Sequence, residues 1–309
     1  MNTKKTPIVF FGNERLATSV QTGVPTLTSL IEAGYDVKAV VSSHEKGISR
    51  SARQLEIKDI ADAHNIPVLL PDKPREILDQ LRSYNAIAAV LVAYGKIVPQ
   101  DVIDVFPRGI INIHPSLLPL HRGPTPLESV ILNGEAKTGV SLMSLVRAMD
   151  AGPIYGQSEL KLDGKETKQQ LADRLLDVGA SMVIELLPGI ISGDIVAIPQ
   201  DDQSATYDKL LTKEDGAIQW SKPAEMIDRE IRAFADWPKS RTTLADKEVT
   251  ITAAHLIDGS GTPGKIEIRD KDLVVYCGDQ ALAIDRIKPA GKNEMTSEAF
   301  IAGHRRLLE

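Results

Sequence analysis

A chain of 309 residues exceeds the usual size of a single domain, which leads us to expect two compact units. Hydrophobic residues make up 42% of the chain and charged residues 25%, proportions of an ordinary globular protein that exclude a disordered chain or a fibrous repeat. The net charge of −6 gives no bulk signal of nucleic-acid binding, apolar runs fall short of the roughly 20 residues of a membrane span, and a lone cysteine excludes an internal disulfide or a multi-thiolate metal site.

In the first two hundred residues, short apolar runs alternate with longer amphipathic stretches. The residues before the first run lack the apolar core and cleavage site of a secretory signal, so we expect a cytoplasmic protein without a membrane partner. The alternation is typical of a mostly parallel sheet, and continuous hydrophobicity indicates strands buried on both faces. We therefore predict a Rossmann-like α/β domain with helices on both faces of its sheet. The expected strands cover residues 7–12, 37–41, 67–70, 86–92, 109–113, 138–145 and 154–162, and the expected helices cover residues 24–33, 52–64, 73–82, 101–105, 127–132 and 167–191.

A polar stretch over residues 199–204 interrupts this pattern and indicates a linker or a domain seam. Beyond one helix at residues 223–233, short β-rich runs are separated by glycines and charged turns, which predicts a smaller OB-like β-barrel. We place the first domain at residues 1–202 and the second at residues 207–309. The expected strands of the second domain cover residues 242–244, 249–255, 265–269, 273–276 and 282–289.

The predicted strand near residue 113 carries an amide and an imidazole, Asn112 and His114, two residues apart. Alternation along a strand sends both side chains to the same face. Ligands of open α/β sheets bind beyond the carboxyl ends of the strands, and Pro115 stops the strand at that point. A strand-end histidine is by itself more often structural, so the assignment depends on the segments that follow.

Two irregular segments follow this strand. Residues 119–126 are too rich in proline and glycine for a helix interior or a central strand, so the loop either presents main-chain groups to a ligand or is a surface turn. Its Arg122 either holds an anionic group or caps a carbonyl. Further on, Asp150 lies in a tight loop between two predicted strands, where Asp-Ala-Gly alone indicates only a turn.

Four segments occur together in this chain: Asn112-x-His114-x-Ser116-Leu117-Leu118-Pro119, Arg122-Gly123, Thr138-Gly139-Val140 and Asp150-x-Gly152. In this combination the chain resembles the formyltransferase family that uses 10-formyltetrahydrofolate. The resemblance implies that Asn112, His114 and Asp150 are catalytic and that 10-formyltetrahydrofolate is the co-substrate, with no metal. It also implies that residues 91–99 line a pterin pocket. The residues assigned to the folate site are Ser116, Leu117, Leu118, Pro119, Tyr94, Lys96 and Val98.

The chemistry of formyl transfer fits these residue types. An amine that attacks an N-formyl carbon builds a tetrahedral oxyanion, which the Asn112 amide and a protonated His114 would stabilise. Asp150 beside His114 would favour the imidazolium, orient the ring and take the proton of the attacking amine directly or through water. The dinucleotide, Walker, zincin and nucleophile-elbow motifs are missing, which argues against nicotinamide, ATP, zinc and serine-hydrolase chemistry.

Six segments of the second half carry a further resemblance: residues 205–207, 211–215, 220–224, 232–238, 289–292 and 303–305. They resemble the carboxy-terminal barrel domain of the methionyl-tRNA formyltransferases, so the resemblance spans nearly the whole chain. It implies that initiator methionyl-tRNA is the partner, that its α-amino group accepts the formyl unit for translation initiation, and that the second domain helps to hold the tRNA. We expect the protein to be a monomer.

Family members also contact the acceptor stem through a basic loop, which corresponds to residues 42–58 here. The alternative is a solvated loop leading into a helix. Formyl transfer to a nucleotide-linked amino sugar and hydrolysis of formyltetrahydrofolate are rival activities, and a folate-binding or tRNA-binding module without catalysis is the remaining alternative. The residues assigned to tRNA binding are Lys46, Arg50, Arg53, Arg122 and Lys292.

Overall fold

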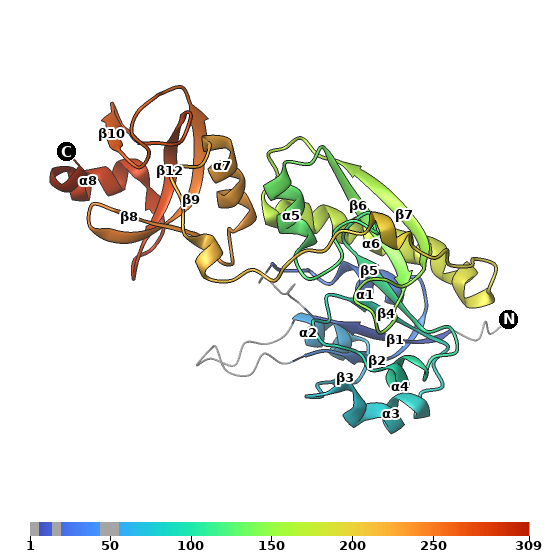
Figure 1. The fold of residues 1–309 in the computed structure, drawn as a ribbon. Coiled ribbons are helices and arrows are strands. Elements are labelled where there is room, and N and C mark those ends of the chain that lie inside the picture. The colour runs from blue at the N-terminus through green and yellow to red at the C-terminus, as the bar shows by residue number, and fades with distance from the viewer. Residues whose placement is uncertain (1–5, 14–19, 44–55, 309) are drawn as a thin grey trace. The chain divides into compact units, whose positions relative to one another are not determined.

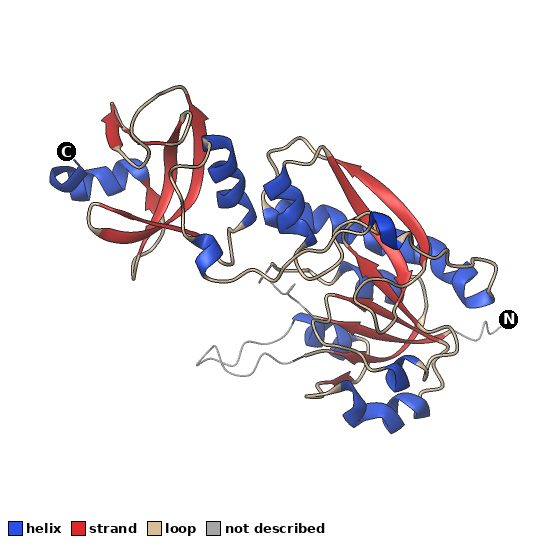
Figure 2. Ribbon diagram, viewed as in Figure 1, coloured by secondary structure: helices blue, strands red, loops and turns tan. Residues whose placement is uncertain are grey.

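The computed structural model describes residues 6–13, 20–43 and 56–308 (Figures 1 and 2). Contacts divide the chain into two compact units, and two short stretches from the first half of the sequence belong to the second unit. The first unit contains Met1–Pro126, Lys137–Leu162 and Gln169–Lys209, and the second contains Leu127–Ala136, Asp163–Lys168 and Leu210–Glu309.

The first unit is built on a seven-stranded sheet. Its strands are β1 (Pro7–Gly12), β2 (Asp36–Val41), β3 (Val68–Leu69), β4 (Ala88–Val92), β5 (Ile110–His114), β6 (Lys137–Ser144) and β7 (Ile154–Lys161). Their order is β3-β2-β1-β4-β5-β6-β7, parallel as far as β5 and antiparallel from β5 to β7. Since the chain builds outward from β1 to β3 and then adds β4 on the other side of β1, the topological switch point lies between β1 and β4.

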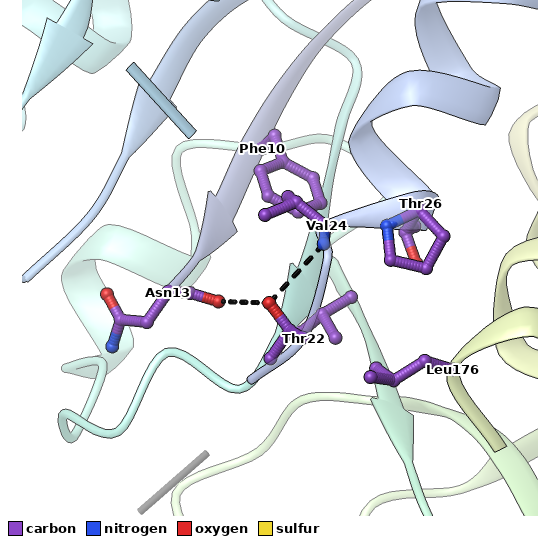
Figure 3. Close-up of a pocket in the computed structure, with 8 residues that line it drawn as sticks. Phe10, Asn13, Thr22, Val24, Thr26 and Leu176 are labelled. Carbon is purple, nitrogen blue, oxygen red and sulfur yellow. Dashed lines mark hydrogen bonds between the residues drawn. The ribbon is translucent and has the colours of Figure 1, made fainter. Parts of the chain in front are cut away.

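Helices cover both faces of this sheet (Figure 1). They are α1 (Pro25–Glu32), α2 (Glu56–Ala63), α3 (Leu78–Ser83), α4 (Gln100–Ile103) and α6 (Lys168–Ser192), with a 3-10 turn at Pro74–Ile77, while α5 (Pro126–Asn133) follows the loop after β5. On one face, Phe11 of β1 packs in a cluster with Leu81 of α3 and Val102 of α4. On the other, Phe10 lines a small pocket with residues of α1 and with Leu176 of α6 (Figure 3). Burial on both sides explains the continuous hydrophobicity of the strands.

Helix α6 is the one helix in the described ranges that is long and apolar enough to cross a membrane, with a mean hydropathy of 1.7 over its most apolar window. In this fold its apolar residues are instead used for packing. Leu171, Leu175 and Val183 are almost fully buried, and a Cβ at Gly179 would meet Cγ2 of Ile113 at 2.6 Å. The helix therefore lies directly on the sheet.

A buried ion pair joins the two early stretches of the second unit. Nζ of Lys168 lies 3.3 Å from Oε1 of Glu128, with side chains 0% and 2% exposed, and also donates to the main-chain O of Trp237 at 3.2 Å. Burial lowers the pKa of Lys168, an effect that the charge of Glu128 opposes. Arg232 of α7 (Ala224–Ala233) donates to the main-chain O of Glu166 at 2.9 Å.

The second unit contains an antiparallel sheet with the strand path β10-β11-β12-β9-β8, and β13 pairs with β12. The strands are β8 (Ser240–Leu244), β9 (Lys247–Ile257), β10 (Ile266–Arg269), β11 (Asp272–Tyr276), β12 (Ala281–Pro289) and β13 (Met295–Thr296). Together with α7 and a C-terminal helix they enclose a core that includes Ile227, Val275, Leu282 and Phe300. A mostly parallel α/β sheet followed by a separate, smaller antiparallel sheet confirms the predicted fold class.

The C-terminal helix α8 (Ser297–Leu308) is an element that the sequence patterns did not predict. Oγ1 of Thr296 accepts the N–H of Ala299 at 3.3 Å and so caps the helix. Phe300, Ile301 and Leu308 are its buried apolar residues, too few for a helical period to stand out in the sequence. The capping threonine was the signal that could have located this helix.

Candidate active site

Strand β5 carries Asn112 and His114 on the same face, as alternation predicts. Asn112 pairs with Leu91 of β4, and Leu91 belongs to the cluster that packs against α3 and α4, so both polar side chains project from that face. They lie at the carboxyl end of the strand and are only 7% and 5% exposed. Their polar atoms therefore lie in a nearly dry environment, where hydrogen bonds are electrostatically stronger than in water.

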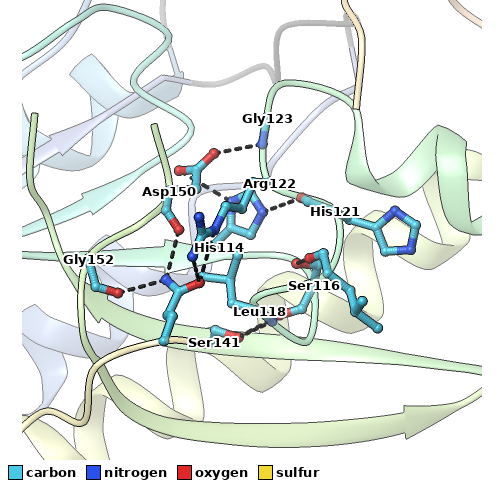
Figure 4. Close-up of polar contacts among 11 residues, drawn as sticks. His114, Ser116, Leu118, His121, Arg122, Gly123, Ser141, Asp150 and Gly152 are labelled. Atoms are coloured by element: carbon cyan, nitrogen blue, oxygen red, sulfur yellow. Dashed lines mark hydrogen bonds and ion pairs between the residues drawn. The ribbon is translucent and has the colours of Figure 1, made fainter. Parts of the chain in front are cut away.

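Both ring nitrogens of His114 have partners (Figure 4). Nε2 lies 2.9 Å from the main-chain O of His121, and because a carbonyl only accepts, Nε2 carries the hydrogen. Nδ1 lies 3.7 Å from Oδ1 of Asp150, at ion-pair distance. The ring is therefore oriented from both ends, and it can donate to a substrate oxygen only by exchanging one of these two contacts.

Asp150 reaches His114 by a route that the sequence did not suggest. Strand β6 runs antiparallel to β5 and ends with Ser144 beside Ile111, at the far end of β5 from His114. The loop 145–153 then folds back and places the Asp150 carboxylate beside the imidazole. The amide and the imidazole thus come from β5, and the carboxylate comes from the loop that follows the antiparallel strand β6.

The backbone of the Asp150 loop is narrowly constrained. Oδ2 of Asp150 accepts the N–H of Gly123 at 2.8 Å, which leaves Oδ1 on the side of His114. Asp150 itself has a φ of 48°, in the left-handed region that few non-glycine residues adopt. At Gly152 a Cβ would lie 1.7 Å from the main-chain O of Ser144, so a glycine is required there.

The residues after the predicted linker pack against the loop that follows β5. Thr206 accepts the Arg122 N–H with its main-chain O at 2.9 Å and donates its own N–H to Pro119 O at 3.2 Å. Its hydroxyl accepts the N–H of His121 at 2.8 Å. The carboxylate of Asp208 lies 3.2 Å from Nδ1 of His121, with both side chains 9% exposed. The loop that presents a carbonyl to His114 is therefore supported along its length.

Arg122 is buried, with 1% of its surface exposed. Its Nε and Nη2 donate to Oε1 of Gln200 at 3.0 and 2.8 Å, Nη2 also donates to Asp202 at 2.7 Å, and Nη1 donates to the Tyr207 hydroxyl at 2.9 Å. The guanidinium of Arg122, which was assigned to tRNA binding, is therefore not exposed to a partner in this structure. Because Gln200 and Asp202 accept from Arg122, the predicted linker or domain seam over residues 199–204 packs against the loop after β5.

Gln200 is a residue of this site that the sequence patterns missed. Its Nε2 donates to the main-chain O of Asp150 at 2.8 Å and to that of Gly152 at 2.7 Å. Its polar neighbourhood indicated only a connecting segment, and no local pattern links it to residues fifty positions earlier. A long-range contact of this kind becomes visible only in the fold.

Four of the residues assigned to the folate site, Ser116, Leu117, Leu118 and Pro119, follow β5 directly. Oγ of Ser116 donates to the main-chain O of Leu120 at 2.7 Å, and Ser116 is fully buried. Oγ of Ser141 accepts the N–H of Leu118 at 3.0 Å and donates to Ser116 O at 2.7 Å. These polar groups shape the loop from within, while Leu117 and Pro119 are half-buried at its surface.

The other three, Tyr94, Lys96 and Val98, lie in the loop after β4. Tyr94 packs edge-on against Phe11 with ring centroids 5.3 Å apart, and burial raises its pKa to about 12. Nζ of Lys96 donates to two main-chain carbonyls of the loop after β3, and Val98 is buried in the same cluster as Tyr94. The exposed side chain of this loop is Ile97, at 87%.

Apart from the buried Arg122, the residues assigned to tRNA binding come from other segments of the chain than the catalytic set. Lys46, Arg50 and Arg53 lie outside the described residues. Lys292 is exposed in the turn after β12. Within the described ranges, no group of three or more histidine, cysteine, aspartate or glutamate side chains is placed to hold a metal ion.

Two family models match successive parts of this chain. The model of the formyl transferase family matches residues 18–187, and that of the formyl transferase C-terminal domain matches residues 210–305. The methionyl-tRNA formyltransferase of Chloroflexus aggregans is 38% identical over 304 residues, covering 96% of both chains. That of Magnetococcus marinus is 35% identical over 302 residues, covering 96% of this chain and 95% of the relative.

Solved structures share the fold at lower identity. HypX from Aquifex aeolicus in complex with tetrahydrofolic acid superposes with a TM-score of 0.69 at 18% identity over 96% of this chain, which spans about half (47%) of HypX. An N-formyltransferase from Helicobacter canadensis, in complex with folinic acid and dTDP-3-aminofucose, gives a TM-score of 0.67 at 18% identity, covering 91% of this chain and 98% of that one.

Proposed function

The chain belongs to the formyl transferase family, and we propose that it transfers the formyl group of 10-formyltetrahydrofolate to the α-amino group of methionine on initiator tRNA. Identity of 35–38% over 96% of the chain supports this acceptor, because it extends through the C-terminal domain as well as the catalytic one. Formylation of this tRNA serves translation initiation, so we place the enzyme in the cytoplasm. We also propose that it acts as a monomer.

The arrangement of Asn112, His114 and Asp150 supports a direct transfer. The amine nitrogen bonds to the formyl carbon and the bond from that carbon to the folate nitrogen breaks. The proton of the amine leaves to Asp150, directly or through water, and the folate nitrogen takes up a proton as tetrahydrofolate departs. A formyl group and a proton thus change places between the two nitrogens, and no covalent enzyme intermediate forms.

We assign the stabilisation of the oxyanion first to the Asn112 amide. No hydrogen bond of its side chain is found within the described part of the chain, whereas Nε2–H of His114 is already donated to the His121 carbonyl. His114 joins as a second donor when its ring exchanges that contact for the substrate oxygen. With both nitrogens protonated, the imidazolium also pairs with Asp150 and balances the charge that develops.

Folate would bind against Ser116, Leu117, Leu118 and Pro119 and against the loop with Tyr94, Lys96 and Val98. Since Tyr94 and Val98 are buried, we assign them to the wall of this site, and Leu117 and Pro119 to its surface. For the acceptor, we retain Lys46, Arg50, Arg53 and Lys292 as candidate phosphate contacts and withdraw Arg122, whose guanidinium is internally satisfied.

The decisive experiment is detection of formyl-methionyl-tRNA by acid gel or mass spectrometry after incubation with 10-formyltetrahydrofolate and methionyl initiator tRNA. The native protein is compared with Asp150→Ala, which should remain folded and lose turnover. Formyl transfer to a nucleotide-linked amino sugar but not to methionyl-tRNA would refute the proposed acceptor. Release of formate without any acceptor would identify a formyltetrahydrofolate hydrolase instead.

A further inference from the structure

Hydrogen bonds lead from the buried Arg122 through Gln200 to the turn that carries Asp150. We propose that Gln200 is a positioning residue, which holds Asp150 in the orientation that formyl transfer needs. The inference rests on the proposed function, in which Asp150 takes the proton of the attacking amine. Gln200 itself touches neither the imidazole nor the carboxylate in the contacts described above.

The orientation of the Gln200 amide is determined by its partners. The guanidinium of Arg122 only donates, so the oxygen of the amide must face it, at 3.0 and 2.8 Å from Nε and Nη2. The NH₂ group then faces the main-chain O atoms of Asp150 and Gly152, which only accept. Each polar atom of the amide is satisfied in this orientation alone, and a flipped amide would leave every one of these contacts mismatched.

The two bonds from Gln200 act on the part of the loop that is most constrained. They bracket the residue between Asp150 and Gly152, and Asp150 has a φ of 48°. A non-glycine residue is strained in this region, and the conformation persists only where its surroundings hold it. Gln200 supplies that support from one side, and the Ser144 carbonyl packed against Gly152 supplies it from the other.

The carboxylate of Asp150 is consequently fixed at two points. Gln200 holds its main chain, and the N–H of Gly123 holds Oδ2 at 2.8 Å. Oδ1 remains 3.7 Å from His114, available to the imidazolium or to the proton of an amine. Because Arg122 is 1% exposed and bonded to three side chains, the far end of this support is rigid.

Two substitutions separate positioning of Asp150 from simple support of Arg122. Gln200→Leu removes the acceptor and both donors. Gln200→Glu keeps an acceptor for Arg122 but sets an oxygen against the carbonyls of Asp150 and Gly152. Gln203→Leu, at an exposed position of the same segment, is the matched control. Steady-state formylation of methionyl-tRNA and thermal unfolding are measured for all four proteins.

We expect both Gln200 variants to lose about 10²-fold in kcat, the cost of displacing a reacting group by about 1 Å. The KM values for folate and tRNA should change by less than about threefold, and Gln203→Leu should behave as the native protein. If Gln200→Glu is folded and keeps the native kcat, the residue serves only to satisfy Arg122 and the proposal is wrong. A loss confined to KM overturns it as well.

Measurement of the native protein in the same assay distinguishes failure of the proposed function from failure of the proposed role of Gln200. A native protein that forms no formyl-methionyl-tRNA contradicts the proposed function and with it this role of Gln200. An active native protein with equally active Gln200 variants contradicts only the role of Gln200.

Discussion

Polar side chains are used in opposite ways in β5, β6 and the loops that follow them and in the sheet of the second unit. His114, Arg122 and Ser141 are buried, and their hydrogen bonds are shared among several partners. In the second sheet and its C-terminal helix, pairs such as Lys271 with Glu298 have both side chains more than half exposed. Buried networks are costly to disturb, whereas exposed ion pairs contribute about 0–1 kcal/mol.

Under the proposed function, this difference predicts which substitutions alter the chemistry and which alter tRNA binding. A buried network fixes atoms to within a fraction of an ångström, which catalysis requires and which tolerates few substitutions. An exposed charged surface attracts a polyanion without strict geometry, so single changes should have graded effects. Substitutions in the first region should therefore affect kcat, and those in the second should affect the KM for tRNA.

The largest effect is expected for Asp150→Asn. The amide keeps an acceptor for the Gly123 N–H but cannot take a proton, so kcat should fall by about 10²–10⁴-fold. Single-turnover formylation measures the loss. Asp208→Asn is a matched control, since that carboxylate pairs with His121 rather than His114. Equal losses in both variants would show that the region responds to any altered carboxylate.

Asn112→Ala should lower kcat on the order of 10²–10³-fold, the usual cost of one oxyanion donor, with little change in either KM. Steady-state kinetics with varied folate and varied tRNA test this split. Asn133→Ala, at the exposed end of α5, serves as the control. A rise in the folate KM with an unchanged kcat would move Asn112 from catalysis to binding.

Gly152→Ala should destabilise the fold by about 1–3 kcal/mol, because the new Cβ meets the Ser144 carbonyl and the loop must shift. Urea unfolding measures the free energy of unfolding, and kcat should fall at the same time because Asp150 lies on that loop. Gly303→Ala is the contrasting change: nothing lies within 4 Å of its Cβ, and alanine in a helix should add about 0.5–1 kcal/mol.

Lys292→Glu tests the second region and should have a smaller effect. We expect the KM for tRNA to rise several-fold and the salt slope of binding to decrease by about one phosphate contact. The KM for folate and the kcat should stay native, and Lys292→Arg should restore tRNA affinity. An unchanged salt slope would show that Lys292 does not contact a tRNA phosphate.

The smallest expected effect is the reactivity of the Cys277 thiol in the folded enzyme. Burial, with a lesser contribution from Asp279, raises the pKa of its thiol to about 11, so only about 10⁻³ of it is thiolate at pH 8. Labelling by iodoacetamide should be slow in the native enzyme, accelerate as the pH rises towards the thiol pKa, and become fast on unfolding. Rapid labelling of an active enzyme at pH 8 contradicts this.

The sequence was enough to predict strands and the faces of their side chains, because a short repeat of polar and apolar residues determines both. Alternation along β5 correctly placed Asn112 and His114 on one face, and continuous apolar runs located strands buried on both sides. The sequence did not predict the contacts that bring segments distant along the chain to the site. The antiparallel direction of β6 hid the approach of Asp150, and a polar stretch that looked like a linker concealed Gln200. Roles inferred from resemblance, unlike positions, await the experiments above.

Because the second unit includes Leu127–Ala136 and Asp163–Lys168, no single cut in the gene separates the two units cleanly. A fragment ending near residue 209 would retain Glu128 and Lys168 but lose the Trp237 carbonyl, which lies 3.2 Å from Nζ of Lys168. The complementary fragment would lose the Glu166 carbonyl that receives Arg232. Engineering a stand-alone catalytic half therefore calls for redesign of α5 and of residues 163–168, for example by replacing Glu128 and Lys168 together with a neutral pair.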